Sequence, residues 1–368
     1  MNWRAPAPGE REAGERTWEV VRGAFDERIR APRRRDRRPL VAIAIAAVLF
    51  AAAFTPPGLA VWGSIKDAVT QEDHLLSLPA HGRVLVNAQG GAWVVQSDGS
   101  KRFLSGYSDA AWSPHGLYLA AARGNQLVAL EPNGRVHWKL ARARPVSEPQ
   151  WSYEGYRIAY FAGPDLRVVN GDGTGDRLLA RNAVGTGLPA LAWRPATHQL
   201  AYKNGHNVLV LVDVDRNKVL WRRQTSGVES LMWSADGQRL LVARNPFTVL
   251  DAQGRLVARL PHGVLLPAAF APGGRRLALV STASGQSTVS IYSGPRYERR
   301  RIIFTGANGF GGLAWSPDGR WLLVDWRTAD QWVFIRSAPV RRIDVRDIGT
   351  TFDSGPEHYA TLAGWCCP

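Results

Sequence analysis

The sequence predicts an all-β fold, a seven-bladed β-propeller, from a repeated phrase, the spacing of its copies and the number of strands around them. The phrase is clearest at Leu313-Ala314-Trp315-Ser316-Pro317-Asp318-Gly319-Arg320. Each copy contains one large aromatic residue, which we call the anchor residue. The seven anchor residues are Trp112, Trp151, Trp193, Trp233, Phe270, Trp315 and, in a degraded last copy, Trp365. The first six follow one another at intervals of 39, 42, 40, 37 and 45 residues, and such a period is typical of propeller blades.

Each repeat has the pattern of four short strands. In the first full repeat, the strand Ala110–Trp112 ends on the anchor residue, apolar strands follow at Leu117–Ala121 and Gln126–Leu130, and a more polar strand covers Arg135–Leu140. Such a sheet cannot bury its faces alone, whereas stacking the sheets radially buries them and closing the ring leaves no free end. We therefore expect the anchor residues to pack between blades, and the Pro, Asp and Gly after them to form type I turns.

The strand count predicts how the ring closes. Strands like the second and third of a blade already occur at Arg83–Val86 and Trp93–Gln96, but no first strand precedes them. The segment His358–Trp365 has strand character and ends on a Trp that aligns with the other anchor residues. We expect it to pair beside Arg83–Val86 and to complete that blade, which gives seven blades. A six-bladed ring is the alternative, and it requires the first and last segments to be something else, such as capping hairpins.

The chain before the repeats divides into three parts, and the propeller follows. Residues 1–38 are predicted to be a charged cytoplasmic segment, residues 39–62 a transmembrane helix, residues 63–80 a linker and residues 81–368 the propeller. The charged segment contains a short amphipathic helix over Glu15–Arg30. Its apolar face consists of Trp18, Val21, Phe25 and Ile29. That face suits the inner membrane surface or a cytoplasmic partner, and a marginal helix without a partner is equally compatible.

The uncharged stretch after the charged segment is long enough for one membrane span. It is most apolar from Leu40 to Phe54, and Pro56 and Pro57 would end a regular helix near the far interface, with Trp62 at headgroup level. The arginine-rich run Arg33–Arg38 precedes it, which by the positive-inside rule places the N-terminus in the cytoplasm. A cleaved secretory signal and a buried core helix are the alternatives. The anchor and the signal both predict an extracytoplasmic propeller, and the anchor predicts a single-pass protein of the plasma membrane.

The charge of the chain indicates anionic neighbours. The net charge is +15, from 46 Lys and Arg against 31 Asp and Glu. The runs Arg299-Arg300-Arg301 and Arg341-Arg342 are expected on outer or fourth strands. With the propeller outside the cytoplasm, nucleic acid is not an expected partner, and anionic lipid or an envelope polymer is. A charge that serves only solubility and topology is the plain alternative.

Local motifs of catalysis and cofactor binding are missing from the sequence. GxSxG, HExxH, P-loop and CxxC patterns do not occur, and the eight His are scattered over turns and linkers. The loop Asn170–Asp176 holds two Asp and three Gly, which is compatible with a Ca²⁺ loop. It lacks the downstream Glu of such a loop, and it falls where a hairpin turn is required. We therefore predict no catalytic residue, no metal and no cofactor, although a propeller can assemble a site from several blades.

The two cysteines, Cys366 and Cys367, are adjacent and stand next to the last residue. An inter-chain disulfide, a metal site, a redox pair and incidental surface thiols are all compatible with the sequence. A bond between the two is not expected, because the peptide between adjacent cysteines would be strained.

The repeated phrases resemble the WD40-like repeats of the TolB-type propeller family. The best copies are Trp315–Arg320, Trp233–Gln238 and Trp112–Gly116, and the turn Val169–Leu179 is also similar. The resemblance covers roughly Arg83 to Trp365, and it weakens at the copies around Trp193 and Phe270. It implies a propeller that serves as an interaction platform on the envelope side. A charged leader, one span and a propeller together look like a membrane-anchored TolB-like protein of a high-GC Gram-positive bacterium. The span replaces the family's separate N-terminal domain, so a translocation-complex role does not carry over.

Two functions follow from these expectations. The sequence favours a non-catalytic scaffold that binds an unknown envelope protein or an anionic polymer, with the lipid bilayer as a further partner through the transmembrane helix. The alternative is a membrane-tethered enzyme, a hydrolase or lyase, with its site at the centre of the ring. Three or more acidic, His or Arg side chains that converge there would favour the enzyme.

Overall fold

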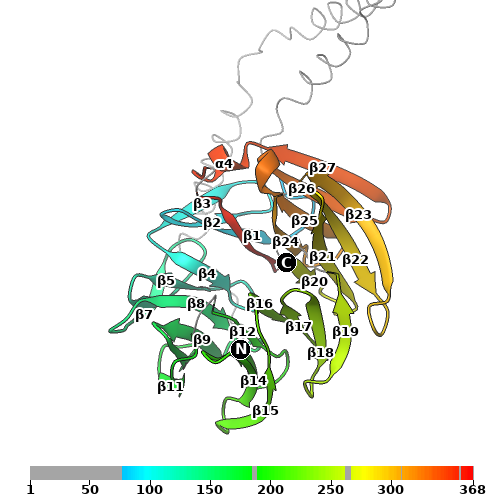
Figure 1. The fold of residues 1–368 in the computed structure, drawn as a ribbon. Helices are drawn as coiled ribbons and strands as arrows, with labels where there is room; N and C mark the ends of the chain where they lie inside the picture. The colour runs from blue at the N-terminus through cyan, green and yellow to red at the C-terminus, as the bar shows by residue number, and fades with distance from the viewer. Residues whose placement is uncertain (1–76, 185–188, 262–266, 308, 356–357, 368) are drawn as a thin grey trace, which may run out of the picture. The chain divides into compact units, whose positions relative to one another are not determined.

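The structure is a computed structural model that describes residues 77–184, 189–261, 267–307, 309–355 and 358–367. These residues form seven antiparallel sheets of four strands each, arranged as the blades of a ring (Figure 1). Blades 2 to 7 each use four consecutive strands, whereas blade 1 combines the last strand with the first three. The seven-bladed prediction is therefore confirmed, and the six-bladed alternative is excluded.

Each blade runs from an innermost first strand to an outermost fourth strand. For each of these four positions, the seven strands are named in order from blade 1 to blade 7. The first strands are β28 (Thr361–Cys366), β4 (Ser108–Trp112), β8 (Val146–Trp151), β12 (Leu191–Trp193), β16 (Ser230–Trp233), β20 (Ala268–Phe270) and β24 (Phe310–Trp315). The second strands are β1 (Arg83–Ala88), β5 (Leu119–Arg123), β9 (Arg157–Ala162), β13 (Gln199–Lys203), β17 (Arg239–Ala243), β21 (Arg276–Ala283) and β25 (Trp321–Trp326). The third strands are β2 (Gly91–Val95), β6 (Gln126–Leu130), β10 (Asp165–Asn170), β14 (Val208–Asp213), β18 (Phe247–Asp251), β22 (Gln286–Ser293) and β26 (Gln331–Ser337). The fourth strands are β3 (Lys101–Ser105), β7 (Val136–Ala141), β11 (Arg177–Ala180), β15 (Lys218–Gln224), β19 (Leu256–Leu260), β23 (Arg299–Ala307) and β27 (Val340–Arg346).

Burial follows from the place of each strand in its blade. First strands of successive blades contact one another around the ring axis. Second and third strands lie between two neighbouring blades, so both of their faces are covered and their sequences are nearly continuous apolar runs, as in β14. Fourth strands are mostly half-buried or exposed, and in β7 half-buried and exposed side chains alternate. The hydrophobic core is accordingly divided into seven clusters, each filling the contact between two blades.

The repeated phrase folds as a tight turn between the first and second strands. In blade 7 the N–H of Gly319 donates to the carbonyl oxygen of Ser316 at 2.8 Å, and Gly319 has a φ of 65°, which favours glycine. The Ser316 hydroxyl accepts a hydrogen bond from the N–H of Trp321 (2.9 Å) and donates to the carboxylate of Asp318 (2.5 Å). Ser, Asp and Gly of the phrase therefore all serve the turn.

The anchor residue of the same phrase joins blade 7 to blade 6. The indole N–H of Trp315 donates to the carbonyl oxygen of Ala269 in β20 at 3.0 Å. Arg276, which opens the second strand of blade 6, lies over the Trp315 ring with its guanidinium 4.7 Å from the ring centroid. It also donates to the carbonyl oxygen of Gly319 at 2.7 Å. Each recognisable part of the phrase thus holds a turn or a neighbouring blade.

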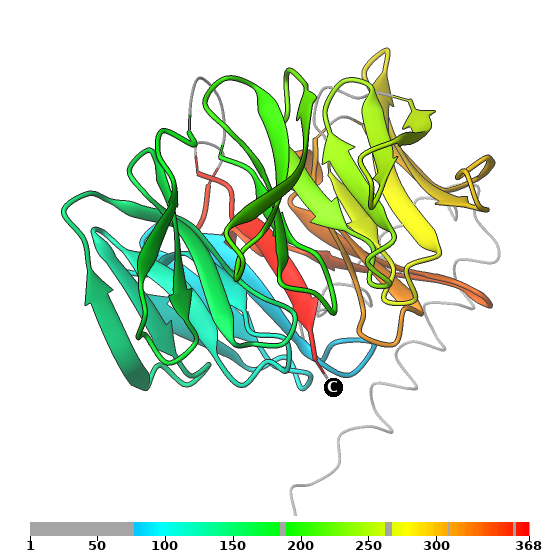
Figure 2. The same ribbon diagram turned by 90° about the horizontal axis from the view of Figure 1, so that it is seen from below.

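The ring closes where β28 pairs antiparallel with β1, the pairing that the strand count predicts. Val84 faces Trp365 and Val86 faces Leu362 in the register of this pair, with a β-bulge between them. Figure 2 shows β28 in red beside the strands of blade 1. Trp365 is buried, and its indole N–H donates to the carbonyl oxygen of His81 at 3.2 Å. The first blade is therefore built from both ends of the propeller.

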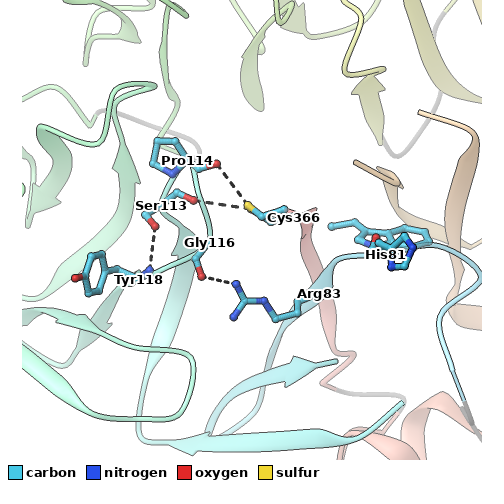
Figure 3. Close-up of a disulfide and its surroundings, with 9 residues drawn as sticks. His81, Arg83, Ser113, Pro114, Gly116, Tyr118 and Cys366 are labelled. Carbon is cyan, nitrogen blue, oxygen red and sulfur yellow. Dashed lines mark hydrogen bonds between the residues drawn. A yellow bond between two sulfur atoms is a disulfide. The ribbon is translucent and has the colours of Figure 1, made fainter. Parts of the chain in front are cut away.

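The end of β28 also contacts blade 2 (Figure 3). Contrary to the expectation from sequence, Cys366 and Cys367 are joined by a disulfide. The Cys366 sulfur lies 3.8 Å from the carbonyl oxygen of Ser113 in the blade 2 turn. Beside it, Arg83 donates to the carbonyl oxygen of Gly116 in the same turn at 2.6 Å. The closing strand is thus held by its own blade and by the next one.

The predicted membrane segment lies outside the described residues. Residues 1–76 include the charged segment, the predicted helix at 39–62 and most of the predicted linker. Among the residues from Ser77 onward that the structure describes, no helix has the length and apolar character of a membrane span. Leu78 is already buried in the core between blades 7 and 1, within the range predicted as linker.

Candidate functional site

The anchor residues are distributed around the ring rather than gathered in one site. Six of them are the last residue of a first strand, and the seventh precedes the last residue of β28. They are Trp112, Trp151, Trp193, Trp233, Phe270, Trp315 and Trp365. Each lies at a contact between neighbouring blades, so the groups that carry a function have to be sought among other side chains.

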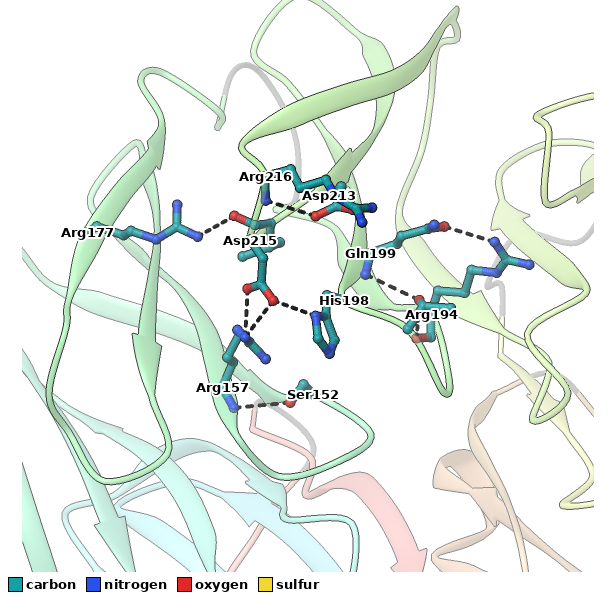
Figure 4. Close-up of polar contacts among 11 residues, drawn as sticks. Ser152, Arg157, Arg177, Arg194, His198, Gln199, Asp213, Asp215 and Arg216 are labelled. Atoms are coloured by element: carbon teal, nitrogen blue, oxygen red, sulfur yellow. Dashed lines mark hydrogen bonds and ion pairs between the residues drawn. The ribbon is translucent and has the colours of Figure 1, made fainter.

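A polar cluster joins blades 3 and 4, where the repeat lacks its Asp-Gly turn (Figure 4). Asp215, after β14, pairs with the guanidinium of Arg157 at 2.7 Å and contacts Nδ1 of His198. The hydroxyl of Ser152 in the same cluster is buried and accepts a hydrogen bond from the N–H of Arg157 at 3.1 Å. Within the described segments, no hydrogen bond joins Ser152 to His198. Asp215 therefore acts as a clamp between blades rather than as part of a Ser-His-Asp site.

Two carboxyl groups meet beside the ring axis. Asp109 of β4 and Glu148 of β8 lie at bulges of neighbouring first strands, with φ of 49° and 50°. The N–H of Glu148 lies 3.5 Å from the Asp109 carboxylate. Burial and, second, the charge of Asp109 raise the pKa of Glu148 to about 7, although water still reaches this side chain. Burial also raises the pKa of Asp109.

A cavity of about 310 Å³ lies in blade 7 beside the short helices η1 (Arg327–Ala329) and α4 (Ile348–Thr351). Asp325 in its wall is 3% exposed, and burial raises the pKa of Asp325 to about 6 against the opposing effect of Arg327. The guanidinium of Arg327 donates to Asp325 at 3.2 Å and lies 5.8 Å from the Tyr359 ring centroid. The volume is at the lower end for small-molecule pockets. Arg327 and Asp325 thus pair with each other, and the Asp330 carboxylate accepts a hydrogen bond from the N–H of Gly349 at 2.6 Å.

The loop Asn170–Asp176 is the hairpin turn between β10 and β11. The Asp172 carboxylate accepts hydrogen bonds from the N–H of Thr174 at 2.9 Å and from its hydroxyl at 2.7 Å. Asp176 instead points into the contact between blades 2 and 3, where it pairs with Arg142 at 2.7 Å and with Arg167. Both carboxylates are thus engaged within the protein. Over the described parts of the chain, no group of three or more His, Cys, Asp or Glu is arranged to hold a metal.

The outer strands of blades 6 and 7 carry a basic surface. Its arginines are all exposed, and they are Arg299, Arg300 and Arg301 of β23 and Arg341, Arg342 and Arg346 of β27. Arg342 lies over the ring of Phe304, 4.6 Å from the centroid, which joins the two strands. Asp344 pairs with Arg342 at 2.7 Å and is the single acidic residue in the two strands. Ile302 and Val340 add exposed apolar area, at 57% and 77% exposure.

Sequence reasoning identified the arginine runs but not the clusters inside the ring. The fourth-strand position of both runs agrees with the prediction. Asp109 and Glu148 each stand three residues before an anchor residue, so aligning the repeats would have placed them at the same site of neighbouring blades. No comparable signal exists for Asp215, Arg157 and His198, because these residues do not recur at one fixed position of the repeat.

Comparison with known proteins shows that solved structures share the fold of this chain. No protein-family profile and no curated protein matches the chain. The β-propeller domain of Cps50 (Swd1) from Myceliophteria thermophila has 14% sequence identity and a TM-score of 0.52, over 66% of this chain and 87% of that one. A chain of the Mitotic Checkpoint Complex has 16% identity and a TM-score of 0.52, over 64% and 78%.

A functionally unknown protein from Desulfotomaculum acetoxidans DSM 771 is also similar. Its identity is 10% and its TM-score 0.57, over 78% of this chain and 100% of that one. At such identities the likeness concerns the fold alone and carries no activity. Together with the closed ring of seven sheets, it shows that this chain is a WD40-like seven-bladed β-propeller.

Proposed function

We propose that this protein is a membrane-anchored, TolB-like scaffold of a bacterial cell envelope, whose propeller binds an acidic protein or an anionic polymer without catalysis. The observation that carries the proposal is the basic surface on β23 and β27. Six exposed arginines, with Asp344 as the one carboxylate within the two strands, create a positive potential that attracts polyanions. Exposed Ile302 and Val340 beside them supply the apolar area that protein interfaces use.

The fold is compatible with this role. Propellers are rigid, and side chains on their outer strands and loops are free to vary, which suits them to hold partners. One of the similar structures is a chain of the Mitotic Checkpoint Complex, and a protein complex is the setting that a scaffold requires. Charges on edge strands also prevent edge-to-edge aggregation, so a test has to measure binding and solubility together.

The membrane anchor is the part of the proposal that rests on sequence alone. Its support is the apolar stretch from Leu40 to Phe54 directly after the arginine-rich run Arg33–Arg38. Reporter domains fused after Arg38 and after Pro368 are expected to lie on opposite sides of the membrane, with the second outside the cytoplasm. Two reporters on the same side would contradict the anchor.

Reversing the charge of the basic surface is expected to abolish binding of a polyanion. The variant carries Arg299→Glu, Arg301→Glu and Arg341→Glu in the full-length chain. Its affinity for poly-glutamate, used as the probe at low salt, should fall at least tenfold because three attractive charges become repulsive. Crosslinking in membranes followed by mass spectrometry should identify a native partner of the wild-type protein, and the variant should no longer crosslink to that partner.

A matched variant separates this surface from net charge. Arg102→Glu, Lys139→Glu and Arg181→Glu change the net charge equally, on exposed residues of blades 1, 2 and 3. This variant should keep most of the affinity, and both variants should stay soluble. Equal loss of binding in the two variants would show that net charge alone is responsible, which would refute the assigned surface.

A further inference from the structure

A small polar cavity lies in the contact between blades 4 and 5, near their outer strands. Its volume is about 70 Å³, and it opens beside β15 and β19. Its apolar part is formed by Leu209, Val242 and Leu250, which are buried core residues of these two blades. The volume is roughly twice the 30 Å³ that one water molecule occupies in the liquid, so it admits one small polar group.

Three arginines line this cavity and no carboxylate does. They are Arg223 of β15, Arg244 just after β17 and Arg259 of β19. Arg223 donates to the carbonyl oxygen of Gly254 at 3.0 Å. The Nε of Arg244 is buried without a hydrogen-bond partner, and within residues 77–184, 189–261, 267–307, 309–355 and 358–367 none of the three arginines forms an ion pair. Arg223 and Arg259 are exposed, whereas Arg244 is half-buried and its unsatisfied buried donor favours an acceptor in the cavity.

The contact between blades 2 and 3 shows which side chains fill the corresponding region between two other blades. The two contacts correspond, because Trp138 of blade 2 donates to Gly171 of blade 3 at 2.9 Å as Trp221 of blade 4 donates to Ala252 of blade 5 at 3.0 Å. The strand registers match as well. Tyr160 pairs with Arg167 in blade 3, as Val242 pairs with Thr248 in blade 5.

In blades 2 and 3 this place holds an internal anion. The Asp176 carboxylate pairs with Arg142 at 2.7 Å and with Arg167, and it accepts a hydrogen bond from the hydroxyl of Tyr160 at 2.5 Å. In blades 4 and 5 the same positions hold Val242, Thr248 and Thr225 in place of Tyr160, Arg167 and Arg142. Leu256, near the start of the outer strand, lines the cavity. The cavity therefore takes its cations from other positions, those of Arg223, Arg244 and Arg259, and no carboxylate accompanies them.

We propose that the cavity lined by Arg223, Arg244 and Arg259 binds a tetrahedral oxyanion, a phosphate group that is either free or the end of a phosphomonoester. Guanidinium groups bind phosphate oxygens through paired N–H donors, and three of them surround this cavity. The hydroxyl of Thr225, a residue that is 9% exposed and lines the cavity, provides a further donor. The bound group balances the charge of these arginines, as the Asp176 carboxylate balances Arg142 and Arg167 between blades 2 and 3.

Calorimetric titration of the full-length protein with inorganic phosphate tests the site. Wild type should bind one phosphate per chain, and Arg244→Gln and Arg223→Gln should each weaken the affinity at least tenfold. Arg255→Gln is the matched control, because Arg255 lies in the neighbouring turn and is paired with Asp251 at 2.8 Å outside the cavity. Glycerol 1-phosphate as a second probe separates the sources: equal affinity for both probes assigns an esterified group, and binding of phosphate alone assigns the free ion.

Leu256→Asp adds a carboxylate to the wall of the cavity. Because it removes no arginine, it tests the site independently of arginine variants that fail to fold. It should abolish phosphate binding while keeping the melting temperature at or above that of wild type without phosphate. Wild type that releases no heat with either probe, or Arg244→Gln that binds as tightly as wild type, would overturn the proposal.

Discussion

Deleting Thr361–Pro368 is expected to lower the free energy of unfolding of the propeller by at least about 5 kcal/mol, a third or more of the roughly 5–15 kcal/mol that stabilises an ordinary domain. The deletion removes β28, the first strand of blade 1, and leaves β1 with an unpaired edge. It also removes Trp365, which packs at 5.6 Å between ring centroids against Phe334 of blade 7. Loss of one large buried aromatic side chain alone costs about 3–5 kcal/mol. Thermal and denaturant unfolding of the truncated protein would measure the effect.

A peptide added in trans distinguishes ring closure from a general effect of truncation. A synthetic peptide of residues 361–368 should bind the truncated protein and restore much of its melting temperature, because it can pair with β1 in the native register. The same peptide with Trp365→Ala should fail. An unchanged melting temperature after the deletion would mean that the ring does not depend on this strand.

The fold could be predicted because the sequence features that specify it recur with each blade. The anchor residues recur once per blade, so counting them gave seven sheets, and the position of Trp365 indicated the closing strand. Errors arose where local chemistry interrupts the period. Leu117 was expected to begin a strand, but β5 begins at Leu119, because Tyr118 N–H is held by the Ser113 hydroxyl at 3.0 Å and Leu117 stays in the turn.

Strand lengths and side-chain clusters were less accessible to sequence reasoning. In blade 6 the sequence pattern predicts strands over Arg276–Val280 and Thr288–Tyr292, but β21 extends to Ala283 and β22 begins at Gln286. The Ser- and Thr-rich hairpin between them lacks an apolar pattern and is held by strand pairing alone. The clamp of Asp215, Arg157 and His198 depends on how two blades meet. That contact is set by the packing of whole sheets, which local sequence does not encode.

Replacing Asp176 by Asn is expected to lower the free energy of unfolding by about 3 kcal/mol, since it removes the charge that balances a partly buried pair of arginines. The Asp176 side chain is 10% exposed, and Arg142 and Arg167 are about one fifth exposed. Burial and, second, the hydrogen bond to Asp176 raise the pKa of Tyr160 to about 12, so the tyrosine stays neutral and cannot supply the missing charge. Denaturant unfolding at neutral pH measures the loss.

Asp344→Asn provides the matched control, because Asp344 pairs with Arg342 at the same 2.7 Å but on the exposed outer strand of blade 7. An exposed pair contributes about 0–1 kcal/mol, so this variant should unfold almost as wild type does. Similar losses in the free energy of unfolding of both variants would mean that burial of Asp176 does not strengthen its ion pairs. A large loss confined to Asp176→Asn would show that Arg142 and Arg167 require a buried anion between blades 2 and 3.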